Sequence, residues 1–353
     1  MKWARLVKRF LPFPQEPPAP PVVAPPPEPE PEPEPVPEKT FTTLDKPLDK
    51  FWKGFKTDHP SMVVLHYTAS FTAASTYDIL KKRGFSVHHT IARDGTRWHH
   101  VSDENRAIHA GYGVWNGLSN SNHYALGIEI NNIAWMEAER ADDSWVFSVD
   151  DEIDPDPEGR EWYRTESYKK DGKTKTTKVA TKTTCAPAPR EHREEWKGKL
   201  WSLYPEDQVL SVCQTVWEWL NEYNILPENV VGHEHVSPHR KSDPGPCFPW
   251  DTVDEYLEAK CAEERPDLID PEQHAKARLK ALQSHLERCG YPVGSIDGVW
   301  GKNTAKCAQL ALDDFAEVYE FGGLGVPTSA SDPNTRLMAR LMRRVPGFDA
   351  GNR

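Results

Sequence analysis

Apolar residues recur along the middle of the chain in two alternating patterns. Short apolar runs predict buried strands, whereas apolar residues spaced three and four apart predict amphipathic helices. The predicted strands cover 63–65, 85–92, 96–101 and 124–130, and the predicted helices cover 72–83 and 209–223. The sequence Arg93-Asp94-Gly95, between two of these strands, is typical of a hairpin turn. Because strands and helices alternate, we predict an α/β fold.

A region near the C-terminus shows only the helical pattern. Its leucines, spaced three and four apart, predict a first helix that ends at Gly290. Two further helices are predicted over 304–319 and 334–342. We therefore expect two folded domains, a larger one over 48–264 and a small three-helix domain over 271–345.

Two segments without a folding pattern precede the first domain. Residues 1–10 interleave basic and apolar side chains and form a basic amphipathic tail. Residues 11–47 are predicted to be an extended linker, because 14 of the chain's 32 prolines lie between Pro12 and Pro37. We interpret the tail as disordered, and contact with a membrane surface or a protein partner is the alternative.

The segment 132–200 interrupts the alternation of strands and helices. Its first part is acidic, and its second part is rich in lysine and threonine, with Asp171-Gly172 as a hairpin turn. We interpret it as an insertion on the domain surface, because loop-closure entropy grows only slowly with loop length. Solvated surface is the main interpretation of its charges, and a binding site for a partner is the alternative.

Composition narrows the possible functions. The net charge of -11 argues against a nucleic-acid-binding protein that relies on a basic face. The chain has no run of about 18 apolar residues, so we expect a soluble protein without a membrane-spanning helix. Six cysteines without a CxxC pair favour a reducing compartment. The N-terminal segment lacks the apolar core of a classical export signal, so none is expected.

Residues suited to metal chemistry lie at the ends of predicted strands. His66 follows the apolar run 63–65, and the segment 232–245 holds histidines, a carboxylate and a lysine. Two imidazoles and one carboxylate are a common set of catalytic zinc ligands, and zinc lowers the pKa of bound water from about 15.7 to about 7. Glu129 ends another strand, where it could orient the water or pass its proton to a leaving amine.

Together these motifs resemble the zinc-dependent N-acetylmuramoyl-L-alanine amidases, a family that includes bacteriophage amidase lysozymes and shares its fold with the peptidoglycan recognition proteins. The segments that carry the resemblance, in this order, are 63–68, 87–95, 108–111, 126–129 and 232–245. The resemblance implies a mixed central sheet flanked by helices, a Zn²⁺ cofactor and bacterial peptidoglycan as substrate.

The resemblance also implies roles for individual residues. The implied zinc ligands are His66, His233 and Asp243. Lys241 would stabilise the tetrahedral intermediate, and Glu129 would be the general acid and base. The implied substrate-binding residues are His109, Ala110 and Asn116. Among the other histidines of the motifs, we interpret His88 as a core residue or one that supports the ligands, and His235 and His239 as exposed loop residues.

The C-terminal region resembles a peptidoglycan-binding domain of the three-helix type. The matching residues are Leu282-Gln283, Leu286, Gly290-Tyr291, the segment 296–301 and Thr304. The alternative interpretation of 296–301 is a capping turn with a packed Trp300.

We therefore expect a peptidoglycan hydrolase that cleaves the amide between N-acetylmuramic acid and L-alanine of the stem peptide by a zinc-hydroxide mechanism. The favoured role is that of a phage or prophage endolysin, held in the host cytoplasm until its release to the cell wall. Association with a virion through the proline-rich arm is the alternative location. A non-catalytic peptidoglycan-recognition module and a cytoplasmic muropeptide-recycling amidase are the alternative functions.

Overall fold

The computed structural model describes most of the chain from residue 39 onward. The described ranges are 39–70, 72–136, 161–170, 173–182, 185–187, 200–238, 240–270, 272–315 and 324–345. The predicted tail, the linker up to residue 38 and the acidic part of the insertion at 137–160 lie outside them. Residues from Phe41 onward belong to one compact unit, and all that follows concerns that unit.

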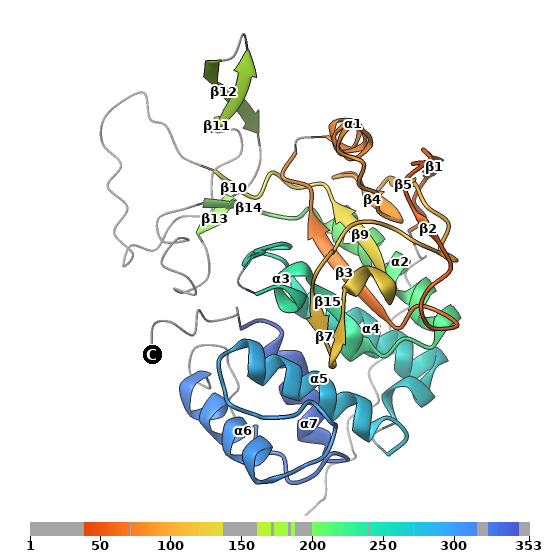
Figure 1. Cartoon of the computed structure of the whole chain (residues 1–353), viewed down its shortest axis with the longest axis vertical. Coiled ribbons are helices and arrows are strands. Elements are labelled where there is room, and N and C mark those ends of the chain that lie inside the picture. Colours follow the sequence, from red (N-terminus) through yellow and green to blue (C-terminus); the bar gives the residue numbers. More distant parts are fainter. Residues whose placement is uncertain are drawn as a thin grey trace, which may run out of the picture. The chain divides into compact units, whose positions relative to one another are not determined.

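Six strands form a mixed central sheet in the order β1-β5-β4-β9-β3-β15 (Figure 1). They are β1 (Thr43–Asp45), β3 (Met62–Tyr67), β4 (His89–Ile91), β5 (Arg97–His99), β9 (Ala125–Ile130) and β15 (Val230–Gly232). Strands β4, β9, β3 and β15 run parallel to one another, whereas β4 and β5 are antiparallel. The mixed sheet confirms the predicted fold class, and the β4–β5 pair confirms the predicted hairpin.

The two faces of the sheet are covered by different parts of the chain. Val63 and Leu65 pack with α2 (Glu206–Tyr223) and α4 (Trp250–Glu264) in the main core, and Figure 1 shows both helices on the far side of the sheet. Met62 and Val64 alternate with them and pack on the opposite face. His66 continues this second set by the same alternation, so its side chain lies on the face away from α2 and α4.

The helix α1 (Ala73–Arg83) has clear signals at both ends. Thr72 caps its first turn, because the Thr72 hydroxyl accepts a hydrogen bond from the Ser75 backbone N–H at 3.1 Å. Gly84 ends it with a left-handed φ of 69°, a conformation that costs glycine little. The predicted helix over 72–83 is therefore confirmed.

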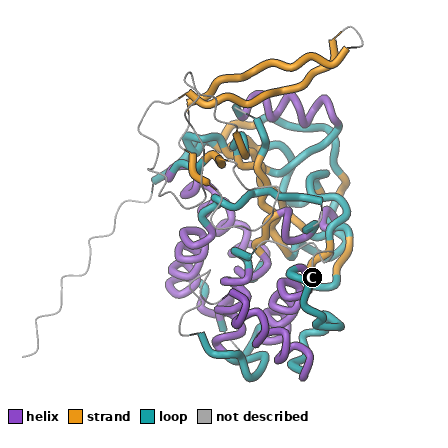
Figure 2. Tube along the Cα trace, turned by 90° about the vertical axis from the view of Figure 1, so that its left-hand side faces the viewer, coloured by secondary structure: helices purple, strands orange, loops and turns teal. Residues whose placement is uncertain are grey.

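From residue 135 onward, the described part of the insertion consists of strands. Strands β11 (Glu161–Lys170) and β12 (Lys173–Lys182) form an antiparallel hairpin, which confirms the predicted one. Its turn residues, 171–172, lie outside the described ranges. Figure 2 shows the two long strands at the top of that view. Strands β10 (Trp135–Met136), β13 (Cys185–Pro187) and β14 (Leu200–Ser202) form a small separate sheet at its base.

Short elements complete the surroundings of the central sheet. Two small antiparallel pairs join β2 (Trp52–Lys53) to β6 (Asn105–Arg106) and β7 (Val114–Trp115) to β8 (Leu118–Ser119). The 3₁₀ helices are η1 (Ser121–His123), η3 (Pro227–Asn229) and η4 (Pro266–Ile269). The helix α3 (His233–Val236) follows β15 without a loop, so the residue after that strand is the first of a helix.

Three helices follow the central sheet, at the positions that the leucine pattern predicts. They are α5 (Ala275–Arg288), α6 (Lys302–Phe315) and α7 (Pro333–Met342), and they share a core that includes Leu282, Leu286 and Met338. The domain boundaries themselves stay predictions. None of the helices within the described ranges is both long enough and apolar enough to cross a membrane.

Buried ion pairs join these helices to α4 and η3. Arg343 donates to Asp254 at 2.9 Å, and Arg278 lies 3.1 Å from Glu228, with all four side chains almost fully buried. A buried ion pair is strongly destabilised when one partner is removed, because the other charge then stays desolvated and unpaired. The three helices are therefore docked through specific contacts rather than through apolar packing alone.

Candidate active site

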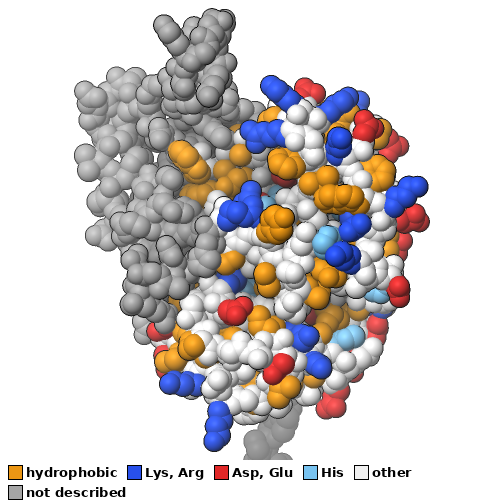
Figure 3. Space-filling view, viewed as in Figure 1, with side chains coloured by type: hydrophobic (Ala, Val, Ile, Leu, Met, Phe, Trp, Pro, Cys, Tyr) orange, Lys and Arg blue, Asp and Glu red, His pale blue; other side chains and the backbone are white. Residues whose placement is uncertain are grey.

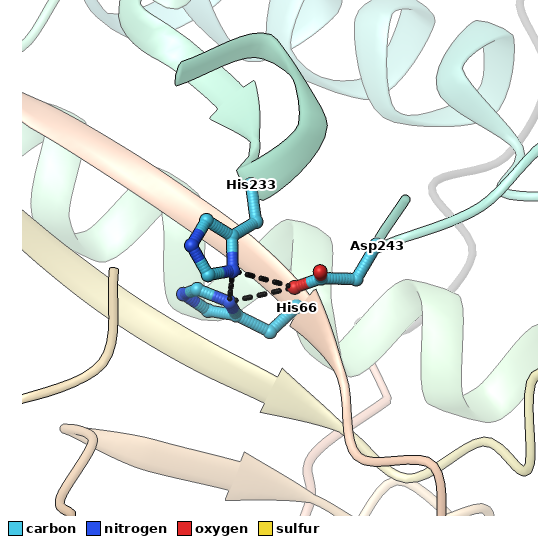
Figure 4. A group of neighbouring side chains, drawn as sticks. All are labelled: His66, His233 and Asp243. Carbon is cyan, nitrogen blue, oxygen red and sulfur yellow. Dashed lines mark hydrogen bonds and ion pairs between the residues drawn. The ribbon is translucent and has the colours of Figure 1, made fainter. Parts of the chain in front are cut away.

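The topology of the sheet brings the predicted site residues to one edge. Strands β3, β9 and β15 are parallel, so their carboxyl ends meet at the same edge of the sheet. His66 on β3 is the register partner of Glu129 on β9. Gly232 on β15 is paired with Leu65, so His233, at the start of α3, lies beside His66. Asp243 reaches the same point from the loop that follows α3 (Figure 4).

Three potential ligand atoms converge at this edge. The Nδ1 atoms of His66 and His233 are 2.9 Å apart, and they lie 2.8 Å and 3.0 Å from Oδ2 of Asp243. All three side chains are buried. Figure 4 shows the two rings and the carboxylate pointing toward one another.

The outer hydrogen bonds of the two imidazoles determine which nitrogen holds the proton. His233 Nε2 lies 2.9 Å from the Ala110 carbonyl oxygen, which can only accept, so His233 carries its proton on Nε2. The Ala125 carbonyl likewise fixes the proton of His109 on Nε2 at 3.3 Å. His109 Nδ1 must then accept from His66 Nε2 at 2.9 Å. The Nδ1 atoms of His66 and His233, at the centre of the group, therefore carry no proton and offer lone pairs.

This arrangement fits a metal ion. Two imidazole lone pairs and a carboxylate oxygen within 3.0 Å of one another repel each other unless a cation lies between them. Metal-binding histidines typically donate their other N–H to a carbonyl or a similar acceptor, as His233 does to Ala110. The three residues therefore suit Zn²⁺, for which two imidazoles and a carboxylate leave a fourth position open.

The local electrostatics keep the His66 imidazole neutral and the Asp243 carboxylate ionised. Burial, with the nearby His233, lowers the pKa of His66 to about 4. Burial by itself would raise the pKa of Asp243, but the close contacts of its carboxylate with His233 and His66 outweigh burial, and the pKa of Asp243 lies well below its usual value. These are the protonation states in which histidine and aspartate bind metals.

The surroundings of Glu129 raise the pKa of its carboxyl group, in contrast to those of Asp243. Burial and the neighbouring charge of Asp243 raise its pKa well above the usual value, and the ammonium of Lys241 offsets only part of this. Its Oε2 atom is buried and has no hydrogen-bond partner in the part of the chain that the structure describes. A carboxyl group with a raised pKa beside an open cavity is suited to donate a proton.

A cavity of about 490 Å³ opens onto these residues. Its walls include the three candidate ligands, Glu129 and Lys241, together with the predicted substrate-binding residues His109 and Ala110. Ile79, Phe85, Arg83 and Arg240 also line it, although the sequence motifs give no signal for them. The wall formed by α1 therefore combines apolar and basic side chains.

Asn122 holds the loop that carries His109 and is a residue that the motifs miss. Its Oδ1 accepts hydrogen bonds from the backbone N–H groups of His109, Ala110 and Gly111 at 2.8 to 3.1 Å. Gly127 makes room for this loop, because a Cβ atom there would lie only 2.6 Å from the His109 ring. Both residues thereby position His109 for its hydrogen bond to His66.

Asn116 is not brought to the cavity with the other predicted residues. Its side chain donates to Asn229 Oδ1 at 2.9 Å, and its backbone N–H donates to Ser284 on α5 at 3.1 Å. The structure places Asn116 at the contact with the C-terminal helices, because the turn between β7 and β8 directs it there.

The other histidines of the motifs have structural partners. His88 is a core residue, as expected, and its Nδ1 accepts from the Gly127 N–H at 3.0 Å. The prediction that His235 is exposed is wrong. His235 is 2% exposed, accepts from the Gly232 N–H at 2.9 Å and packs against Trp250. His239 lies outside the described residues.

A sheet edge with two histidines, an aspartate, a glutamate and a lysine around a cavity is an arrangement suited to metal-dependent hydrolysis. Residues 56–173 match the family model of the N-acetylmuramoyl-L-alanine amidases.

Known relatives carry the same family description. The chain is 22% identical over 196 residues to the N-acetylmuramoyl-L-alanine amidase AmiD of Escherichia coli, a match that covers 54% of this chain and 50% of that protein. It is 36% identical over 44 residues to the 1,6-anhydro-N-acetylmuramyl-L-alanine amidase AmpD of Enterobacter cloacae, covering 12% of this chain and 22% of that protein. The chain thus spans half or less of the length of these relatives.

Solved structures give matches of lower similarity. The complex of Escherichia coli AmiD with anhydro-N-acetylmuramic acid-L-Ala-D-gamma-Glu-L-Lys aligns with a TM-score of 0.39 and 17% identity, covering 83% of this chain and 91% of that chain. The N-acetylmuramoyl-L-alanine amidase LysC of Clostridium intestinale aligns with a TM-score of 0.35 and 17% identity, covering 62% and 98%.

Proposed function

We propose that the protein is a zinc-dependent peptidoglycan hydrolase that cleaves the amide between the lactyl group of N-acetylmuramic acid and L-alanine of the stem peptide. The observation that carries the proposal is the convergence of two imidazole lone pairs and the Asp243 carboxylate beside Glu129 and Lys241 in one cavity. The family match of residues 56–173 supports the same bond type.

The residues of the site divide the chemistry among them. When bound by His66, His233 and Asp243, a zinc ion would polarise the amide carbonyl and acidify a water molecule. The ammonium of Lys241 stabilises the negative charge that develops on the carbonyl oxygen. Glu129, whose raised pKa favours the protonated form, donates its proton to the nitrogen of the leaving L-alanine.

The charge of the cavity suits an anionic peptide. Arg83, Arg240 and Lys241 line it in a chain whose net charge is -11. Figure 3 shows Lys and Arg side chains gathered over α1 at the top of that face, where the last turn of the helix carries Lys81, Lys82 and Arg83. A local basic rim attracts carboxylates of a stem peptide despite the overall negative charge.

We propose further that the protein acts on polymeric peptidoglycan as an endolysin, held in the host cytoplasm until it is released to the cell wall. The three C-terminal helices support this role, because the segment 271–345 resembles a peptidoglycan-binding domain and its helices are docked beside the catalytic sheet. A recycling amidase acts on soluble muropeptides, and a wall-binding region would not help it to bind them.

Mass spectrometry of digested peptidoglycan tests the proposed reaction. Purified sacculi are incubated with the protein as isolated, after treatment with a chelator, and after zinc is restored. The expected result is new L-alanine amino termini and intact glycan strands, lost with the chelator and regained with zinc. Binding to sacculi without cleavage in any of these samples would instead support a non-catalytic recognition module.

The endolysin role is tested by substrate competition. Rates are measured on intact sacculi and on a soluble anhydromuropeptide at equal concentrations of cleavable bonds. An endolysin is expected to prefer sacculi by about tenfold or more, because wall binding raises the effective concentration of bonds. A preference for the soluble muropeptide would contradict this role and favour recycling.

A further inference from the structure

A second group of metal-binding side chains lies on the sheet face that α2 covers. His89 on β4 and His99 on β5 are paired across the antiparallel ladder, so their side chains point to the same face. Their ring centroids are 5.1 Å apart. His89 also packs against Trp219 of α2, with ring centroids 5.5 Å apart. This is the face opposite the one that carries His66.

Asp103 joins the two histidines from the loop after β5. Trp219 Nε1–H donates to its Oδ2 atom at 2.7 Å and so fixes the carboxylate. The other oxygen, Oδ1, faces His89 Nε2 at 4.0 Å, which is beyond hydrogen-bond distance. Oδ1 is buried and has no hydrogen-bond partner within the described ranges. A buried carboxylate oxygen left in this state costs free energy unless a donor or a cation reaches it.

The two imidazoles are also set up as ligands. His99 Nδ1 lies 3.1 Å from the carboxylate of Asp45, the partner that orients many metal-binding histidines, and this leaves Nε2 available. His89 Nδ1 is buried without a hydrogen-bond partner among the residues described. One ligand atom from each of His89, His99 and Asp103 lies within 4.8 Å of the others.

We propose that His89, His99 and Asp103 form a second metal site, which binds Zn²⁺ or a similar divalent transition-metal ion. Two imidazoles with one carboxylate match the ligand preference of such ions. Zinc bonds of about 2.0 to 2.2 Å place ligand atoms roughly 3.3 Å apart. A shift of under about 1 Å would close the 4.0 Å gap between His89 and Asp103. The His99 side chain, 34% exposed, has room to approach both residues.

The role that follows from this geometry is structural. The ion would join β4 and β5 to each other and, through Asp103 and Trp219, to α2. None of the three residues of this cluster lines the cavity onto which Glu129 and Lys241 open. The inference does not depend on the proposed function, because it rests on residues outside the candidate active site.

Counting bound metal in purified full-length variants tests the second site. Wild-type protein, H99Q, D103N and H233Q are loaded with Zn²⁺, dialysed against metal-free buffer and analysed for zinc per chain. We expect two ions in the wild type and one in each variant. The control H59Q, which alters an exposed histidine outside both clusters, should keep two. An unchanged zinc count in both H99Q and D103N would overturn the proposal.

Cobalt spectroscopy separates loss of a site from loss of folding. Titration of Co²⁺ into H233Q reports the second site alone, and the expected result is one visible d–d absorption that H233Q combined with H99Q lacks. The zinc count of a variant is used only if its far-ultraviolet circular dichroism matches that of the wild type. We expect H99Q to fold, because it alters a partly exposed side chain. Absence of any cobalt signal in folded H233Q would also overturn the proposal.

Discussion

Two groups of side chains in the described ranges contain two histidines and one aspartate each, yet they differ in spacing and depth. In the first group, His66, His233 and Asp243 are buried, and their ligand atoms lie 2.8 to 3.0 Å apart. In the second group, His89 Nε2 lies 4.0 Å from Asp103 Oδ1, and the side chain of Asp103 is 26% exposed. The same residue types therefore occur in a tight and in a loose arrangement.

The surroundings of the two groups explain what each can do. The first group faces a cavity and has Glu129, whose raised pKa suits proton donation. The second group faces α2, and its outer partners are Trp219 and Asp45. The comparison teaches that a ligand set alone does not define an enzyme, because catalysis also needs space for substrate and a group that moves a proton.

Removing a ligand of the tight group should have the largest effect. Asp243→Asn is expected to lose zinc and to lower peptidoglycan hydrolysis by about 10³-fold or more, because two imidazoles alone hold the ion weakly. The matched change in the loose group, Asp103→Asn, should leave hydrolysis within about twofold of the wild type. Rates of L-alanine amino-terminus release measure both, and equal losses in the two variants would remove the distinction between the groups.

Glu129→Gln should separate catalysis from metal binding within the tight group. Loss of a general acid typically costs about 10² to 10⁴ in rate, while zinc per chain should stay as in the wild type. The pKa of Glu129 is raised, so the active protonated form persists to higher pH, and wild-type activity should fall as pH rises through that pKa. A wild-type pH profile of kcat without such a decline would contradict the assigned role.

Acid should destabilise the histidine-rich interior between the two groups. Burial lowers the pKa of His88 and of His100 to about 4, whereas both titrate near 6.5 in the unfolded chain. Between about pH 6.5 and pH 4 the unfolded state binds more protons, so stability is present above this window and falls as pH drops through it. The loss should be on the order of 3 kcal/mol per histidine.

Urea unfolding at several pH values measures this loss. The variant His100→Gln should have a shallower decline of the free energy of unfolding with falling pH than the wild type, because it lacks one of the two groups. If the free energy of unfolding declines equally with falling pH in both proteins, His100 does not contribute to the loss of stability in acid.

Asn122→Ala should loosen the tight group without removing a ligand. Three backbone N–H groups lose their common acceptor, and an unsatisfied buried donor costs about 1 to 3 kcal/mol. We expect kcat/KM about tenfold lower and a lower melting temperature. Asn122→Asp, which keeps an acceptor oxygen, should retain most of both, and equal effects of the two substitutions would argue against this positioning role.

His99→Gln should have the smallest effect on activity, within about twofold. Its expected signature is the loss of part of the zinc-dependent rise in melting temperature, a few degrees, since an ion that binds only the folded state stabilises it. Thermal unfolding with and without zinc, in H99Q and in the control H59Q, measures the difference. If zinc raises the melting temperature equally in the wild type, H99Q and H59Q, His99 does not bind zinc. The second group would then differ from the first in metal binding as well as in catalysis.

Local signals made several features predictable from the sequence. The bounds of α1 follow from Thr72 and Gly84, and the β4–β5 hairpin follows from the turn sequence between its strands. The burial of His235 was not predictable in this way. Its neighbours Trp250 and His285 come from distant parts of the chain, so no pattern near His235 reports them.

The sequence by itself determined the elements, the order of the motifs and the residue types that can bind a metal, because these depend on neighbours within a few positions. Only the tertiary structure decided which atoms meet. His66 and Asp243 are 177 positions apart and come within 2.8 Å, and carbonyl groups of other loops set the proton positions on the rings. The pairing of His89 with His99 likewise depends on strand register, which fixes which side chains share a face of the sheet.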